Sequence, residues 1–298
     1  MSNRLYEKVA EELCPNGNWQ LSDTMGKLLS LQINRLPRSD IPEEEVRYPT
    51  SPAAMRAFLD TFFTRHYFQV QNCLLDYLTS EDFIEMLGTK NLSILDIGAG
   101  PAVASLAITD VVARVIRQLS GLGRVSNSEI VKTKYILNDT ANICLGTGQE
   151  LIRNYFRMSP RGESKLSHAG TFTIGKEFPA SVSQIRRICR NLGFYSIVVL
   201  SYVVNPLSEK QGFANTIRGL KEVEMMCNPA GRVLIVQDRF SESVIKKVAR
   251  LMGESCQKDM LAQFVYSSEN SNDSYTYQYY YCLFEPNGCA SGSAAVSA

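Results

Sequence analysis

The chain has 298 residues, of which 45% are hydrophobic and 20% are charged, so it is long enough to bury the core of one large domain or two ordinary ones. These values are those of ordinary globular proteins, and they exclude a disordered chain or an integral membrane protein. With 31 Lys and Arg residues against 30 Asp and Glu residues, the chain has no general electrostatic field for polyanions, and nucleic-acid binding would need a local basic patch.

The eight cysteines are scattered and form no C-x-x-C pair. We therefore expect reduced thiols, mostly in the core, and no metal site. The N-terminal segment lacks the apolar stretch of a secretory signal, and no apolar run is long enough to span a bilayer. These features predict a soluble, cytoplasmic protein without a membrane partner.

Residues 1–90 have helical periodicity and predict a helical N-terminal cap over a substrate site. Ser22 before one apolar stripe and Ser51-Pro52 before another are typical helix starts. The second stripe continues into a segment rich in aromatic residues, for which core packing is one interpretation. The other is that Arg65, His66 and Tyr67, at a junction between helices, face a cofactor or substrate.

Residues 91–106, NLSILDIGAGPAVASL, predict a strand, a glycine turn and the start of a helix. The run before the turn is almost wholly apolar, as in a parallel strand buried on both faces. Gly98 and Gly100 can adopt positive φ and allow a ligand to approach the backbone closely. Such a turn presents free N–H groups at the carboxyl end of the strand, where doubly wound sheets bind ligands.

Two residues distinguish this turn from the glycine-rich fingerprint of a dinucleotide-binding site. Val103 is branched where that fingerprint needs a small residue, and Asp96 precedes the first glycine by two positions. The pattern D-x-G-x-G resembles motif I of the class I S-adenosylmethionine-dependent methyltransferases. The resemblance implies that Asp96 orders the glycine loop near the methionine end of the cofactor, and that the turn binds the cofactor through Gly98, Ala99 and Gly100. Ala102 replaces the third glycine of the fuller family pattern.

A second strand, residues 135–137, ends in Asn138-Asp139 and leads into another helix. This arrangement resembles motif II of the same family, in which an acid accepts the ribose hydroxyls. The family spacing favours Asn138, whereas the stronger acceptor is the carboxylate of Asp139. The alternative is that both residues only cap the helix.

Residues 157–168 predict a polar loop, and residues 171–174 predict a short third strand. A helix over residues 181–192 follows, with three arginines on one side that suit a solvated face. The next segment, SIVVLSYVVNPLSE, predicts a fourth strand and resembles methyltransferase motif IV, with Ser196 in place of the family acid. By that resemblance, Ser201, Tyr202 and Asn205 line the site of methyl transfer.

The remaining segments continue the same plan. They predict a helix over residues 213–227, a fifth strand over 232–236, a helix over 241–252, strands over 261–266 and 275–284, and a disordered tail over 287–298. The last two strands form a hairpin with no helix between them. An antiparallel closing strand distinguishes a methyltransferase sheet from an ordinary dinucleotide fold.

The sequence as a whole predicts an α/β protein. Its parts are a helical cap (1–90), a Rossmann-like seven-stranded methyltransferase sheet with an antiparallel last strand (91–286), and the tail. The resemblance implies S-adenosylmethionine as cofactor and methyl transfer to a small-molecule or peptide acceptor, with Tyr202, Tyr67 and His66 as the catalytic candidates. Two alternatives stay open: an RNA methyltransferase associated with the ribosome, and a non-catalytic binding or assembly protein with this fold.

Overall fold

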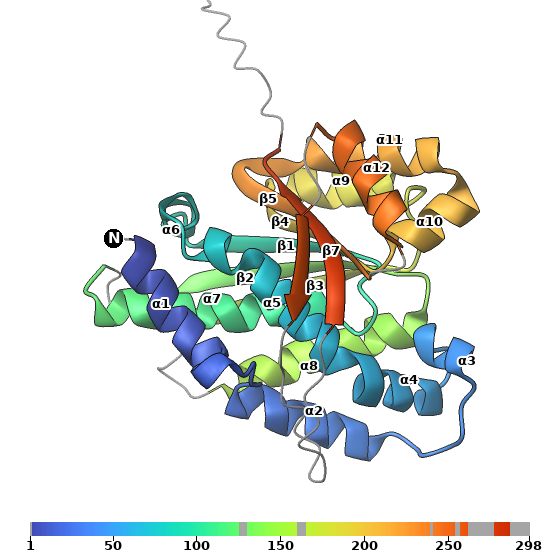
Figure 1. Ribbon diagram of the computed structural model, residues 1–298, viewed down its shortest axis with the longest axis horizontal. Helices are drawn as coiled ribbons and strands as arrows, with labels where there is room; N and C mark the ends of the chain where they lie inside the picture. Colours follow the sequence, from blue (N-terminus) through green and yellow to red (C-terminus); the bar gives the residue numbers. More distant parts are fainter. Residues whose placement is uncertain are drawn as a thin grey trace, which may run out of the picture.

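The computed structural model describes residues 2–124, 130–159, 165–238, 241–253, 257–261 and 277–286. In these ranges one seven-stranded sheet has the order β3-β2-β1-β4-β5-β7-β6 (Figure 1). The strands are β1 (Asn91–Ile97), β2 (Val131–Asn138), β3 (Leu166–Ile174), β4 (Tyr195–Ser201), β5 (Cys227–Asp238), β6 (Gln257–Leu261) and β7 (Tyr277–Phe284). The first five are parallel, and β7 is antiparallel to both β5 and β6. The predicted α/β class and antiparallel last strand are confirmed.

Helices cover both faces of the sheet (Figure 1). One face is covered by α9 (Val182–Leu192), α10 (Val204–Gln211), α11 (Phe213–Glu224) and α12 (Glu242–Leu251). The other face is covered by α5 (Thr64–Leu78), α7 (Val103–Gly121) and α8 (Asn142–Met158), with α1 (Ser2–Leu13) and α2 (Asp23–Arg35) packed outside them. The shorter helices are α3 (Glu43–Arg47), α4 (Pro52–Phe58) and α6 (Glu81–Leu87). Because the sheet is covered twice, its central strands are apolar on both faces.

The two helix starts predicted in the cap are present. The Ser22 hydroxyl accepts a hydrogen bond from the Met25 N–H, and the Ser51 hydroxyl accepts one from the Ala54 N–H. The junction expected before His66 is not a break, because a π-helical turn (Leu59–Phe63) joins α4 to α5 without interruption. Such turns insert one residue and change which side chains face the core.

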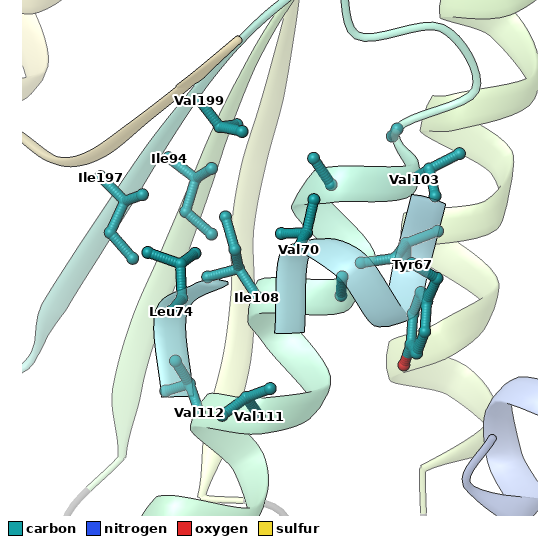
Figure 2. Close-up of a cluster of buried hydrophobic side chains, with 14 of the residues drawn as sticks. Tyr67, Val70, Leu74, Ile94, Val103, Ile108, Val111, Val112, Ile197 and Val199 are labelled. Carbon is teal, nitrogen blue, oxygen red and sulfur yellow. The ribbon is translucent and has the colours of Figure 1, made fainter. Parts of the chain in front are cut away.

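The cap and the sheet share one hydrophobic core. Val70 and Leu74 of α5 point toward Ile108 and Val112 of α7 and toward Ile94 of β1 (Figure 2). All five side chains are at most 1% exposed, so α5 is part of the layer that covers the sheet. The helices before residue 90 therefore do not form a hydrophobic core separate from that of the sheet.

Several predicted boundaries differ from the structure. Residues 166–168, expected in a loop, pair with β2 as the start of β3. Residues 228–231, expected to connect a helix to the fifth strand, lie inside β5 at a shift in its register with β4. Helix α10 was not predicted. Strand β6 ends where the sixth strand was expected to begin, and residues 262–266 and 287–298 lie outside the described ranges. None of the described helices is both long and apolar enough to cross a bilayer.

A buried ion pair fastens the N-terminal helices to α7. Asp110 and Arg114 of α7 are 4% and 7% exposed, with 3.2 Å between Asp110 Oδ2 and Arg114 Nη2. Asp110 Oδ1 also accepts hydrogen bonds from the hydroxyls of Ser22, the N-cap of α2, and of Tyr155 in α8. Arg114 Nη1 donates to the backbone carbonyl of Glu12 in α1 at 2.6 Å. One carboxylate and one guanidinium thus connect four helices.

Replacing Arg114 by methionine should lower the free energy of unfolding by about 3–5 kcal/mol, because the Asp110 carboxylate stays buried without its cation. Arg117→Met is the matched control, since the Arg117 side chain pairs with Glu12 but is 49% exposed and should cost less than about 1 kcal/mol. Urea denaturation of both variants measures the difference. Similar losses in the two variants would contradict this role of the buried pair.

Candidate functional site

The glycine turn after β1 is held by the end of β2. The N–H groups of Gly98 and Ala99 both donate to the Asn138 carbonyl oxygen, at 2.8 and 3.0 Å. Gly98 and Gly100 have φ values of +67° and +52°, as expected for glycines in this turn. Ala102 has a φ of +61°, so the residue that replaces the third family glycine carries backbone strain that a glycine would not.

Asp139 joins the turns that follow β1 and β2. Its Oδ2 accepts a hydrogen bond from the Gly100 N–H at 2.9 Å, and its Oδ1 accepts one from the Ala141 N–H at 2.9 Å. The side chain is half-buried. Each carboxylate oxygen keeps a further lone pair, so Asp139 can accept hydroxyl groups of a ligand while it holds the turn.

The Asn138 side chain is used inside the protein. Its Nδ2 donates to the carbonyl oxygens of Ile174 and Lys176, and its Oδ1 accepts from the Ser181 hydroxyl at 2.9 Å. The residue is 1% exposed. Of the two ribose candidates, Asp139 is therefore the one whose side chain can reach a ligand, and the backbone carbonyl of Asn138 positions the turn.

Asp96 caps α7 from the end of β1. Its Oδ2 accepts hydrogen bonds from the N–H and the hydroxyl of Ser105, at 3.1 and 2.8 Å, while its Oδ1 has no partner. The side chain is fully buried. Burial, together with the nearby charge of Asp139 and against the two Ser105 hydrogen bonds, raises the pKa of Asp96 to about 7. An unpaired carboxylate oxygen therefore lies beneath the glycine turn.

The end of β4 meets α5 through an aromatic stack. The rings of Tyr202 and His66 are stacked with 3.8 Å between their centroids and 15° between their planes. The Tyr202 hydroxyl donates to Gln69 Oε1. Tyr202 has a φ of +62°, which strains a bulky residue. Burial, followed by the nearby Arg65, lowers the pKa of His66 well below its usual value, so its imidazole is neutral at pH 7.

The space over the two glycines differs. A Cβ atom on Gly98 would lie 2.5 Å from Cγ2 of Val203, whereas a Cβ atom on Gly100 would meet nothing within 4 Å. Gly98 therefore permits the close approach of the loop after β4, rather than that of a ligand as its family role suggested. Gly100 is the glycine that faces open space.

The structure brings most of the predicted residues to one edge of the sheet. These residues lie at the carboxyl ends of three strands: Asp96 and the turn of Gly98, Ala99 and Gly100 at β1, Asn138-Asp139 at β2, and Ser201 with Tyr202 at β4. Val203 connects the last group to the first. His66 joins them through its stack with Tyr202. The Asn205 side chain lies outside the described part of the chain.

Tyr67 does not belong to this group, which corrects the prediction that it faces the substrate. Its side chain is fully buried among α5 and α7, near Val103, and points away from the strands (Figure 2). Burial, followed by the charge of Asp110, raises the pKa of Tyr67 far above its usual value. A neutral, inaccessible phenol can contribute to packing but cannot contact an acceptor.

Three residues of the site were missed from the sequence. Ser105 could have been found, because a serine in the first turn of a helix that follows a buried acid is a ready partner for it. Gln69 lies on the buried face of α5, where a polar residue needs a partner. Nothing in the sequence distinguishes Val203 from an ordinary apolar residue.

No protein-family model matches the sequence, and no curated protein matches it significantly. Among solved structures, the O-methyltransferase from Bacillus cereus in complex with SAH is 12% identical, with 95% of this chain and 100% of that chain covered and a TM-score of 0.39. The precorrin-6y C5,15-methyltransferase from Geobacter metallireducens is 10% identical, with coverages of 70% and 89% and a TM-score of 0.39. The N-methyltransferase NodS from Bradyrhizobium japonicum is 12% identical, with coverages of 76% and 98% and a TM-score of 0.38.

These likenesses are distant, and the class of the protein rests on its own strand order and turn. Five parallel strands, a strand switch between β1 and β4, and an antiparallel β7 inserted beside β5 form a Rossmann-like sheet closed by a hairpin. With the D-x-G-x-G turn at the switch, the sheet has the parallel strands and the antiparallel closing strand expected from the resemblance to the class I S-adenosylmethionine-dependent methyltransferases.

The stability of the protein should depend on pH through Asp96. Its pKa of about 7 in the folded chain exceeds the unfolded value of about 3.9, so the folded state binds more protons between these values. The free energy of unfolding should fall as pH rises from about 4 to 7, by roughly 4 kcal/mol at most. Asp96→Asn should remove this slope. Parallel pH profiles for the variant and the wild type, from urea denaturation, would contradict the assignment.

Substitutions at Gly98 and Gly100 should distinguish the energetic cost of a steric clash from the cost of a positive φ. Gly98→Ala adds a clash with Val203 to the cost of a positive φ and should destabilise the fold by about 2–4 kcal/mol. Gly100→Ala carries only the conformational cost, about 1 kcal/mol. Thermal melts of both variants test this order. A melting temperature for Gly98→Ala equal to that of Gly100→Ala would show that the loop after β4 is not packed against Gly98.

Proposed function

We propose that the protein binds S-adenosylmethionine at the carboxyl edge of β1, β2 and β4 and transfers a methyl group to a small-molecule or peptide acceptor. One observation carries the proposal: a glycine turn held open at Gly100 lies between two carboxylates, Asp96 and Asp139, at the strand switch. Open α/β sheets bind their ligands at this place.

The residues present fit the proposed cofactor. Asp96 Oδ1 is buried without a donor, so a cationic group nearby would satisfy it and lower its pKa. Asp139 is positioned by two backbone N–H groups and has lone pairs available for a pair of hydroxyls. Both kinds of partner, a positively charged methionine end and a ribose, belong to one molecule of S-adenosylmethionine.

Bound S-adenosylmethionine supplies a methyl group on a sulfonium, which an acceptor nucleophile displaces in line. The work of the protein is then to align the acceptor and to exclude water. The loop after β4 is the best placed element for both tasks, because Val203 closes the space over Gly98 while Tyr202 stacks on His66 of α5. We assign acceptor contact to His66, Ser201 and Tyr202, and exclude Tyr67 because it is buried.

The alternatives differ in what they need. An RNA acceptor needs several basic side chains beside the site, and the partly buried segment at Tyr202 offers an aromatic stack with a single arginine, Arg65, which lies over the Phe62 ring. A non-catalytic protein needs only the fold. Its strongest support is that Tyr202, Gln69 and His66 satisfy one another without a ligand.

Isothermal titration calorimetry tests cofactor binding. The protein should bind S-adenosylmethionine and S-adenosylhomocysteine and prefer both to NAD. Gly100→Val should abolish binding, because its side chain would extend into the open space at the turn, whereas Gly123→Val is the matched control, with a positive φ and no neighbour within 4 Å at the far end of α7. Binding of NAD without response to either sulfur nucleoside would refute the proposal.

Methyl-labelled cofactor and fractionated cell extract then identify the acceptor. Label in the small-molecule or peptide fraction is the expected result. Label in RNA would support an RNA acceptor, and cofactor binding without methyl transfer would support a non-catalytic protein. Tyr202→Gly removes the ring at a position where glycine relieves the backbone strain, and Tyr202→Phe keeps the ring. The glycine variant should lose turnover and keep cofactor affinity, and the phenylalanine variant should keep most of both.

A further inference from the structure

We infer that the face formed by α9–α12 has a groove along α11 that binds an acidic amphipathic helix of a partner protein. The groove is a hollow of about 490 Å³. Its apolar lining comes from Phe213, Ala214, Ile217, Met225 and Leu251. It lies on the face of the sheet opposite α5 and α7, so this inference does not depend on the proposed methyltransferase site (Figure 1).

Two large apolar side chains of the lining are exposed. Met225 is 58% exposed and Leu251 is 43% exposed, and they meet at the same hollow, so they form one patch rather than scattered single residues. Phe213 and Ile217 of α11 and Met225, the residue that caps its C-terminus, lie four and eight residues apart in a row; Phe213 is partly buried and Ile217 is 9% exposed. This row spans about 18 Å at about 1.5 Å per residue, the length of three turns of a partner helix.

The charge around the groove is strongly biased. The helices α9–α12 carry nine basic residues, all exposed, against four acidic ones, although the chain as a whole is balanced. The basic residues are Arg186, Arg187, Arg190, Lys210, Arg218, Lys221, Lys246, Lys247 and Arg250. Among the acidic residues, Glu222 pairs with Arg186, Glu242 pairs with Lys246, and Glu224 is buried. Arg218, Lys221 and Glu222 line the groove itself, and the charge of Glu222 is already paired with Arg186.

An apolar floor with a basic rim complements a helix that is apolar on one side and acidic on the other. A second copy of this chain does not fit, because two such basic faces would repel each other. RNA fits poorly, since the only aromatic ring in α9–α12 is Phe213, and the Lys247 ammonium lies 4.2 Å from its centroid. A membrane would favour apolar side chains that protrude, whereas these line a hollow.

The test uses the full-length protein and a fluorescein-labelled peptide of roughly 14 residues, with Leu at i, i+3, i+4 and i+7 and Glu at the other exposed positions. Fluorescence anisotropy should show saturable binding that weakens as salt is raised. The double variants Met225→Ser/Leu251→Ser and Lys221→Glu/Arg250→Glu should each weaken binding by about tenfold or more. A scrambled peptide of the same composition should bind at least tenfold more weakly.

Matched controls lie on other elements. Leu31→Ser changes an exposed leucine of α2 (49% exposed), and Lys132→Glu reverses an exposed charge in β2. Neither should change peptide affinity, and all variants should melt within a few degrees of the wild type because the changed side chains are exposed. Absence of saturable peptide binding, or equal affinity in the groove and control variants, would overturn the proposal. So would binding of phosphatidylserine vesicles or single-stranded RNA that requires the groove residues when the peptide does not bind.

Discussion

The candidate site depends on the contact between the ends of β1 and β2. One carbonyl oxygen, that of Asn138, accepts two N–H groups of the glycine turn, and the neighbouring Asp139 carboxylate accepts a third from Gly100. These bonds fix the turn in a conformation in which every second residue has a positive φ: Gly98, Gly100 and Ala102. The Asp96 carboxylate then holds the first turn of α7 from below. The edge is thus shaped before any ligand arrives, which reduces the cost of binding one.

The rest of the fold supports this edge from both sides. Helix α5 packs on β1 and α7 and carries His66 to the end of β4, and the π-helical turn before it sets which side chains of α5 face that end. The buried pair of Asp110 and Arg114 attaches α1, α2 and α8 to α7. The helical cap therefore contributes to the core and places His66 beside Tyr202, on the proposed acceptor side of the site.

The sequence predicted those parts of the fold that depend on local chemistry. The apolar run of β1, the glycine turn and the serine starts of α2 and α4 each follow from a few neighbouring residues, and each is present. Some strand boundaries were wrong because they depend on pairing between strands. Cys227 pairs with Tyr195 and Arg232 pairs with Ile197, so residues 228–231 lie inside β5 at a shift in its register with β4.

The site itself was predicted less completely, because its geometry depends on contacts between distant segments. Periodicity could not show that Tyr67 faces α7 while its neighbour His66 faces Tyr202. Family spacing favoured Asn138, whereas carboxylate chemistry favoured Asp139, the preferred candidate. Only the bonds to Ile174, Lys176 and Ser181 show that the Asn138 side chain is already occupied. Val203 contacts Gly98, which is more than a hundred positions away in the sequence, and the local sequence pattern of neither segment indicates this contact.

The most direct test of the account is to map the backbone amide signals by NMR while S-adenosylhomocysteine is added to the labelled protein. The account predicts that the largest shifts fall on Gly98, Ala99 and Gly100 and on Asp139, which share hydrogen bonds at the strand switch. The amides of α11 and α12 should not move. No shifts at saturating ligand, or shifts confined to elements away from the ends of β1, β2 and β4, would contradict it.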